Sequence, residues 1–233
     1  MKLKWIGLVL AAGLLAAGPF LRPGPLGTAE AYNYSLSVAD AVTQFRAGEL
    51  PALAGQSEFA FNGRIHPLRT APGLAYAAGL LDVLTFRQLG FWTLQNLTLA
   101  LALVAAALAA YAALRRVAET PPAVSAVLAA AYVLSPPVLA AAYGMDLYMT
   151  VLVTPWVPIA VGAAVASFSG KRRSESYLLA ISLAAAWLAH PPVALWLTAT
   201  CGLLQIFALV IRRPTRDDLL ALAGAAGLFV MLG

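Results

Sequence analysis

Charged residues and cysteine are both scarce in this chain. Only 11% of its 233 residues are Asp, Glu, Lys or Arg, whereas soluble domains carry about 25% charged residues. The composition therefore excludes an ordinary soluble domain. The single cysteine, Cys201, excludes an internal disulfide and argues against a metal–thiolate site, since both need more than one thiol.

Apolar residues take the place of the missing charges. They make up 61% of the chain, and the mean hydropathy is +0.82. A helix that crosses the hydrocarbon core of a bilayer needs about 20 apolar residues, because the core is roughly 30 Å thick. The sequence therefore predicts an all-α fold, a polytopic bundle of about seven transmembrane helices. These cover residues 5–21, 90–113, 121–142, 147–168, 177–211 as a hairpin, and the start of a last span at 219–233.

Basic residues cluster beside the apolar runs, which is typical of cytoplasmic loops. The clusters are Lys2 with Lys4, Arg115 with Arg116, residues 171–173, and Arg212 with Arg213 and Arg216. They predict a multi-pass protein of the cell inner (plasma) membrane with a cytoplasmic N-terminus. They also account for the net charge of +5, so we expect no nucleic-acid partner. The alternative for residues 5–21 is a cleaved signal peptide; either choice leaves residues 22–89 outside.

The long polar passage, residues 22–89, is predicted to be an outer, periplasmic or extracellular loop. Within it, Val38, Val42 and Phe45 recur at helical spacing, which predicts a short interfacial helix. Residues 73–84 predict a second short helix, too short to cross and expected to lie in the outer leaflet. Asp82, near the end of that helix, is expected to be a solvated or capping carboxylate.

Two proline pairs interrupt the apolar segments. Pro136 and Pro137 break the third span, and Pro191 and Pro192 mark the turn of the 177–211 hairpin. Broken helices at membrane depth must be lined by protein or water, so we expect a cavity that opens to the outside. His190, a polar ring at this depth, is then a candidate site residue, with a packed core histidine as the alternative.

Several short motifs resemble a known family. The outer loop places Asp40 early and continues through a Gly…Pro…Asn-Gly…Pro…Pro-Gly-Leu-x-Tyr passage, which resembles the GT-C superfamily of membrane glycosyltransferases. Other stretches are similar to bacterial membrane proteins labelled 6-pyruvoyl-tetrahydropterin-synthase-related. These stretches are residues 132–137, the tripeptide Asp146-Leu147-Tyr148, Pro155 with Pro158, and Ala189-His190.

The resemblance implies a glycosyltransferase that takes a polyprenyl-phosphate-linked sugar donor on the outer face of the membrane. The acceptor would be a cell-envelope glycan, lipid or protein. The family's loop aspartate is a general base, and Asp40 is the residue that matches it. Candidates for substrate binding, mainly through charge-assisted hydrogen bonds to phosphate, are Arg64, His66, Arg69, His190 and Asp146.

The same resemblance implies a single GT-C-like transmembrane domain over residues 1–233. Because residues 219–233 begin a span with no anchor beyond it, we expect this domain to be the N-terminal fragment of a longer protein. A divalent metal is a candidate cofactor without an assigned ligand set. Ala39 and Ala41 flank Asp40 where relatives carry a second acid or a nearby histidine.

Each assignment has an alternative. Asp40 is otherwise a solvated carboxylate, Arg64 and Arg69 are otherwise lipid-headgroup contacts, and Asp146 is otherwise a helix cap. For the whole protein the alternatives are a polytopic transporter or lipid flippase without glycosyl transfer, or a non-catalytic assembly subunit. The predicted spans from Gly90 onward contain no Asp, Glu, Lys or Arg, which argues against ion-coupled transport.

Overall fold

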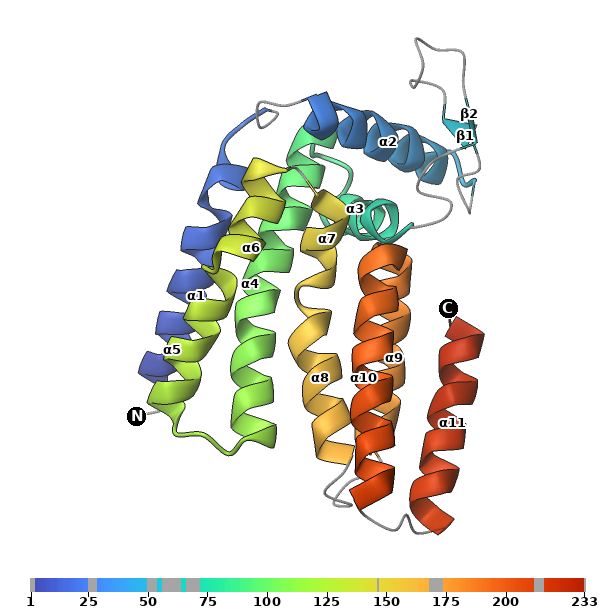
Figure 1. Cartoon of the computed structure of the whole chain (residues 1–233). Coiled ribbons are helices and arrows are strands. Elements are labelled where there is room, and N and C mark those ends of the chain that lie inside the picture. Colours follow the sequence, from blue (N-terminus) through green and yellow to red (C-terminus); the bar gives the residue numbers. More distant parts are fainter. Residues whose placement is uncertain are drawn as a thin grey trace.

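The chain forms an almost entirely helical bundle. The computed structural model describes residues 3–24, 29–49, 54–55, 64–65, 72–145, 147–167, 174–211 and 216–232. The long helices run side by side, while α2 lies across their upper ends and α3 sits between α2 and the tops of α9 and α10 (Figure 1). The elements before the second span are α1 (Leu3–Ala17), η1 (Gly18–Leu21), α2 (Ala29–Arg46), β1 (Ala54–Gly55), β2 (Arg64–Ile65) and α3 (Gly73–Leu84). They are followed by α4 (Phe91–Val117), α5 (Pro122–Val133), α6 (Pro136–Leu139), the π-helical η3 (Ala140–Gly144), α7 (Tyr148–Val153), α8 (Trp156–Ser167), α9 (Ser174–Ala189), α10 (Pro191–Ile211) and α11 (Arg216–Leu232).

Five stretches of the described chain are long and apolar enough to cross a membrane. They are Leu3–Leu21, Phe91–Val117, Pro122–Gly144, Tyr148–Ala166 and Pro191–Ala208. The predicted seven spans are therefore not confirmed. α9 has only 16 residues, about 24 Å of helix, because it begins at Ser174 and ends before Pro191. α11 has 17 residues and opens with three charged residues.

Proline breaks the helices where the sequence predicts it. α5 ends at Val133 and α6 begins at Pro136, with Ser135 held in an extended conformation by the proline that follows it. His190 forms the corner between α9 and α10. A further break between α7 and α8, at Thr154 and Pro155, interrupts the fourth span. The bundle thus contains two discontinuous membrane segments, α5–α6 and α7–α8.

Small residues let α1 and α4 approach closely. A Cβ atom on Gly13 would lie 2.9 Å from the Cα of Val104, so only glycine fits at this crossing. Six of the nine alanines of α4 are buried, and the helix packs against α1, α5 and α8. Close packing of small side chains is the usual way in which helices associate in lipid. The alanine-rich part of α4 is therefore packing surface.

A helix is present where the sequence predicts the short interfacial one, and it is longer than the sequence indicates. α2 starts at Ala29 and ends at Arg46. Its end is a Schellman motif: Gly48 donates to the carbonyl of Phe45, and Glu49 donates to the carbonyl of Gln44. Gly48 adopts φ +86°, a left-handed conformation that glycine tolerates best. The chain then leaves α2 toward the β1–β2 pair, in which Gly55 faces Arg64.

Candidate functional site

Asp40 lies on α2 and is nearly enclosed. Only 7% of its surface is exposed, and its neighbours Val38, Ala41 and Val42 are fully buried. The backbone carbonyl of Asp40 accepts a hydrogen bond of 3.3 Å from Nε2 of Gln44. This burial rules out the alternative of a fully solvated carboxylate.

Arg46 belongs to the opposite flank of α2. Six residues separate it from Asp40, which corresponds to about 240° around the helix axis. Its guanidinium turns instead to α3, where Nε lies 2.9 Å from Oδ2 of Asp82 and Nη2 contacts Oδ1. It also lies 5.4 Å from the ring centroid of Phe91, in cation–π geometry. The hydrogen bonds to Asp82 raise the pKa of Arg46, so it stays a cation.

Asp82 is not the solvated or capping carboxylate that the sequence predicts. Its surface is 2% exposed, and both of its oxygens accept from Arg46. The prediction was wrong because the partner is 36 residues away in the sequence. A carboxylate in this position is stable only with its cation, since an unpaired buried charge is costly. Asp82 is thus a structural link between α2 and α3.

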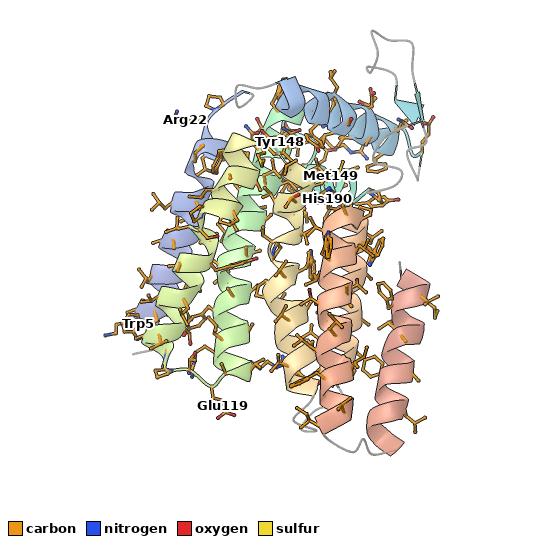
Figure 2. All side chains as sticks on the ribbon, viewed as in Figure 1. Trp5, Arg22, Glu119, Tyr148, Met149 and His190 are labelled. Carbon is orange, nitrogen blue, oxygen red and sulfur yellow. The ribbon has the colours of Figure 1, made fainter. Side chains whose placement is uncertain are left out.

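An aromatic cluster lies beneath α2, at the end of the bundle that this helix crosses. The ring of Phe20 lies 4.9 Å from Tyr143 and 5.6 Å from Tyr148, and Tyr34 on α2 lies 5.4 Å from Tyr148. The hydroxyl of Tyr143 donates to the carbonyl of Ala16. Figure 2 shows Tyr148 just under α2. The sequence analysis singled out Tyr148 only as part of a motif and missed the cluster, whose members come from four separate elements.

Two adjacent amides on α4 join the same layer. Gln95 accepts a 2.9 Å hydrogen bond from the hydroxyl of Ser35 on α2, and Asn96 donates to the carbonyl of Gly24 at 2.9 Å. Both side chains are buried. These contacts attach α2 and the segment before it to the first turns of α4. Two amides inside a predicted span are unusual. Gln95 and Asn96 could therefore have been recognised as candidates from the sequence.

His190 stands at the α9–α10 corner, next to α7. Its Nδ1 lies 3.1 Å from Oγ1 of Thr150, and its side chain is half-buried. Figure 2 shows His190 beside Met149, below α2 and on the same end of the molecule as Tyr148. Burial lowers the pKa of His190, so the neutral imidazole is favoured near neutral pH. The position of His190 at the hairpin turn is as the sequence predicts.

The remaining candidates cannot be placed as side chains. The backbone of Arg64 pairs with Gly55 in the β1–β2 ladder. His66, Arg69 and Asp146 lie outside the described residues. The structure therefore places four residues at the same end of the bundle: Asp40, Tyr148, Thr150 and His190. Within the described part of the chain, no three His, Cys, Asp or Glu side chains come close enough to hold a metal ion.

A third buried acid lies at the opposite end of the bundle. Glu175, in the first turn of α9, is 2% exposed and pairs with Nη2 of Arg116 in the last turn of α4. The preceding residue of α4, Arg115, donates to the carbonyl of Thr120. Each charge in the Arg116–Glu175 pair also suits its helix end, since acids favour N-termini and bases favour C-termini. The sequence analysis read Arg115 and Arg116 as topology signals and missed their acidic partner.

The end of the bundle below α2 thus combines a buried carboxylate, aromatic rings with hydroxyl groups, and a neutral imidazole next to a hydroxyl. A carboxylate of this kind can take a proton from an acceptor hydroxyl, and aromatic faces can pack against a sugar ring or an isoprenoid chain. Comparisons with protein families, with curated proteins and with solved structures find no match for this chain.

Proposed function

We propose that the chain is the membrane domain of a glycosyltransferase that uses a polyprenyl-phosphate-linked sugar on the outer face of the membrane. Asp40 acts as the general base toward the acceptor hydroxyl. Arg64, His66 and Arg69 hold the donor phosphate, while His190 and Asp146 contribute to substrate binding. The acceptor is a glycan, lipid or protein of the cell envelope.

One observation carries the proposal: a carboxylate that is only 7% exposed, Asp40, lies on α2, the helix whose Tyr34 packs against Tyr148 of the aromatic cluster. Arg46, at the end of the same helix, pairs with Asp82 of α3. A general base must lie within hydrogen-bond reach of the hydroxyl from which it takes the proton, and a carboxylate can fill that role. The interface is also where a lipid-linked donor presents its sugar.

The transporter alternative has its own support in the two discontinuous segments, α5–α6 and α7–α8. Transporters often bind substrate where helices break near the bilayer midplane. In the described part of this chain, however, the buried acids Asp40, Asp82 and Glu175 lie on helices or helix ends near the two bundle ends. No described span from Phe91 to Leu114, or from Tyr148 to Ala166, carries an acid within it. This distribution favours chemistry at one surface over ion-coupled passage.

The test is a transfer assay on membranes that contain the whole chain. Polyprenyl phosphates carrying radiolabelled monosaccharides are added as a panel, and label that moves into envelope material is measured. Asp40→Asn keeps the shape of the side chain but cannot accept a proton. Transfer should fall by about 10²-fold or more, the usual scale for loss of a general base.

Glu49→Gln is the matched control, because Glu49 is an exposed carboxylate just beyond the end of the same helix. Its transfer rate should stay unchanged. Donor binding is followed separately with a photoreactive polyprenyl phosphate, which Asp40→Asn should still capture. An active Asp40→Asn variant would refute the role of Asp40, and a chain that neither captures the probe nor moves any sugar favours the transporter.

A further inference from the structure

α3 presents an apolar stripe to its surroundings although its other face is already buried. The inward face consists of Leu74, Ala75, Ala78, Gly79 and Asp82. The outward stripe is formed by Tyr76, Leu80, Val83 and Leu84, all of them exposed. Their spacing, i, i+4, i+7 and i+8, is that of one continuous helix face. A helix that is apolar on both sides requires cover on its outer side as well.

The depth of α3 is fixed by its contact with α9. A Cβ on Gly73 would lie 2.8 Å from the Cα of Ala189 and 2.9 Å from the carbonyl oxygen of Leu188, so the two helix ends touch. α3 therefore sits level with the outer end of α9 and below α2 (Figure 1). Leu188 is itself exposed. The stripe thus belongs to the outer end of a surface that, in a membrane protein, faces lipid.

The end of α3 has the same hydrogen bonds as the end of α2. Phe86 donates to the carbonyl of Val83 at 3.0 Å, and Arg87 donates to the carbonyl of Asp82 at 2.7 Å, which completes a Schellman motif. At the position that Gly48 occupies after α2, this motif has Phe86, with φ 54°. A side chain with a Cβ is strained in that conformation, and a bulky one is uncommon there.

The described part of the chain leaves the ring of Phe86 largely uncovered. The ring is 84% exposed, and the neighbouring Arg87 is exposed and also left-handed, with φ 61°. Among the described residues the strain therefore has little compensating packing, and water is a poor environment for an aromatic ring. An aromatic ring beside an arginine, at the end of an apolar stripe, has the chemistry of a membrane-interface anchor.

We propose that the outer leaflet of the bilayer is the partner of this surface. The stripe of α3 and the ring of Phe86 enter the boundary between acyl chains and headgroups, and the guanidinium of Arg87 meets lipid phosphate. The left-handed corner turns both side chains outward at the point where the chain leaves α3 for α4. This anchor holds α2 and its neighbours at the membrane surface, and it is independent of any catalytic role of Asp40.

Spin labels at single cysteines test the anchor in the whole chain, reconstituted in vesicles of equal parts phosphatidylcholine and phosphatidylglycerol. Cys201 is first replaced by serine, and one cysteine at a time is placed at Leu80, Phe86 or Arg87. Collision with oxygen, which concentrates in lipid, is compared with collision with a water-soluble nickel chelate. Thr43→Cys is the matched control, because Thr43 is an exposed polar residue on the neighbouring helix α2.

The oxygen-to-nickel ratio should be several-fold higher at positions 80 and 86 than at position 43, with position 87 between them. A ratio at 86 equal to that at 43 would mean that the corner lies in water and would overturn the anchor. Low collision with both reagents, with spin–spin broadening between labels, would identify a second copy of the chain as the occupant and would also overturn it. The label at 80 keeps the test decisive if the Phe86 variant folds poorly.

Discussion

Arg46 and Asp82 join α2 to α3 through two parallel hydrogen bonds, Nε to Oδ2 at 2.9 Å and Nη2 to Oδ1 at 2.5 Å. The side chain of Asp82 is 3% exposed, whereas that of Arg46 is 31% exposed. The pair is therefore asymmetric: one charge depends entirely on its partner, and the other can still reach water. This asymmetry determines what removal of either charge should do.

The first prediction is that Arg46→Gln destabilises the protein more than Asp82→Asn. Arg46→Gln leaves a buried carboxylate without a cation and should cost about 3 kcal/mol, whereas Asp82→Asn leaves an arginine that can turn to water and should cost about 1 kcal/mol. Thermal unfolding in one detergent gives the order. The double variant should recover part of the loss, since two neutral side chains leave no buried charge.

Equal losses of stability in Arg46→Gln and Asp82→Asn would contradict the near-complete enclosure of the Asp82 carboxylate.

The Arg46–Asp82 pair also decides which control suits the test of Asp40. Asp82→Asn is a poor control for a catalytic carboxylate, because loss of its link to α2 disturbs the helix that carries Asp40. Glu49→Gln is the better control for that reason.

Much of this end of the molecule follows from local sequence patterns. α3 spans Gly73–Leu84, the same bounds that Pro72 and the apolar run predict, and the hairpin turns at His190 because Pro191 cannot continue α9. The start of α2 was missed by about nine residues, since its apolar spacing becomes regular only at Val38. The residues of α2 before Val38 mix polar and apolar side chains without helical spacing, and Ser35 among them is buried against Gln95 of α4.

The pairs of charges could not be predicted in the same way. Asp82 and Arg46 are 36 positions apart, and Glu175 and Arg116 are 59 positions apart. Each of these residues looks like an ordinary helix-end charge when its neighbours in sequence are the only evidence. Which helix ends meet depends on the packing of whole helices, such as α4 against α8 and α8 against α9. Local periodicity carries no information on how helices pack. The arginines were therefore interpreted as topology signals alone.

The second prediction concerns the Arg116–Glu175 pair at the other end of the bundle. Arg116→Gln should destabilise the protein by about 3 kcal/mol, because Glu175 is 2% exposed and would be left without a cation. Glu175→Gln should cost less, since the side chain of Arg116 is 42% exposed and can be solvated. The charge swap Arg116→Glu with Glu175→Arg places each charge at the unfavourable helix end and should restore only part of the stability.

Glu119→Gln is the control for the Arg116–Glu175 pair. Glu119 is exposed and lies at the same end of the molecule (Figure 2). Its stability should match that of the unmodified chain within about 0.5 kcal/mol. A loss in Glu119→Gln as large as that in Arg116→Gln would attribute the effect to net charge at this end and not to the buried pair.

The third prediction is the sidedness of the two ends. Arg22, Tyr148 and His190 lie at one end of the bundle, and Trp5 and Glu119 lie toward the other (Figure 2). From the basic clusters we expect Asn62 and Pro191 outside, and Arg116, Arg172 and Arg213 inside. With Cys201 replaced by serine, single cysteines at these positions are treated in intact cells with a reagent that cannot cross the membrane. Labelling at 172 or 213 would reverse the orientation and move Asp40 to the cytoplasmic face.

The last prediction is a pH dependence of stability that comes from His190. Burial lowers the pKa of its imidazole in the folded chain, while the unfolded chain should titrate near about 6.5. Between these two values the unfolded state binds more protons, so the free energy of unfolding falls as the pH falls. Stability is thus complete above about pH 6.5 and is lost as the pH drops below that, until the folded imidazole is protonated too.

His190→Gln should remove this slope, measured as the unfolding temperature in nanodiscs across the acidic range. Thr150→Val is the matched control: it removes the hydroxyl that lies 3.1 Å from Nδ1 but leaves the imidazole enclosed, so the slope should remain. The reason is that burial, and not this hydrogen bond, is what lowers the pKa. A His190→Gln variant with the same slope as the unmodified chain would show that His190 already reaches water in the folded state, as a residue of an open cavity would.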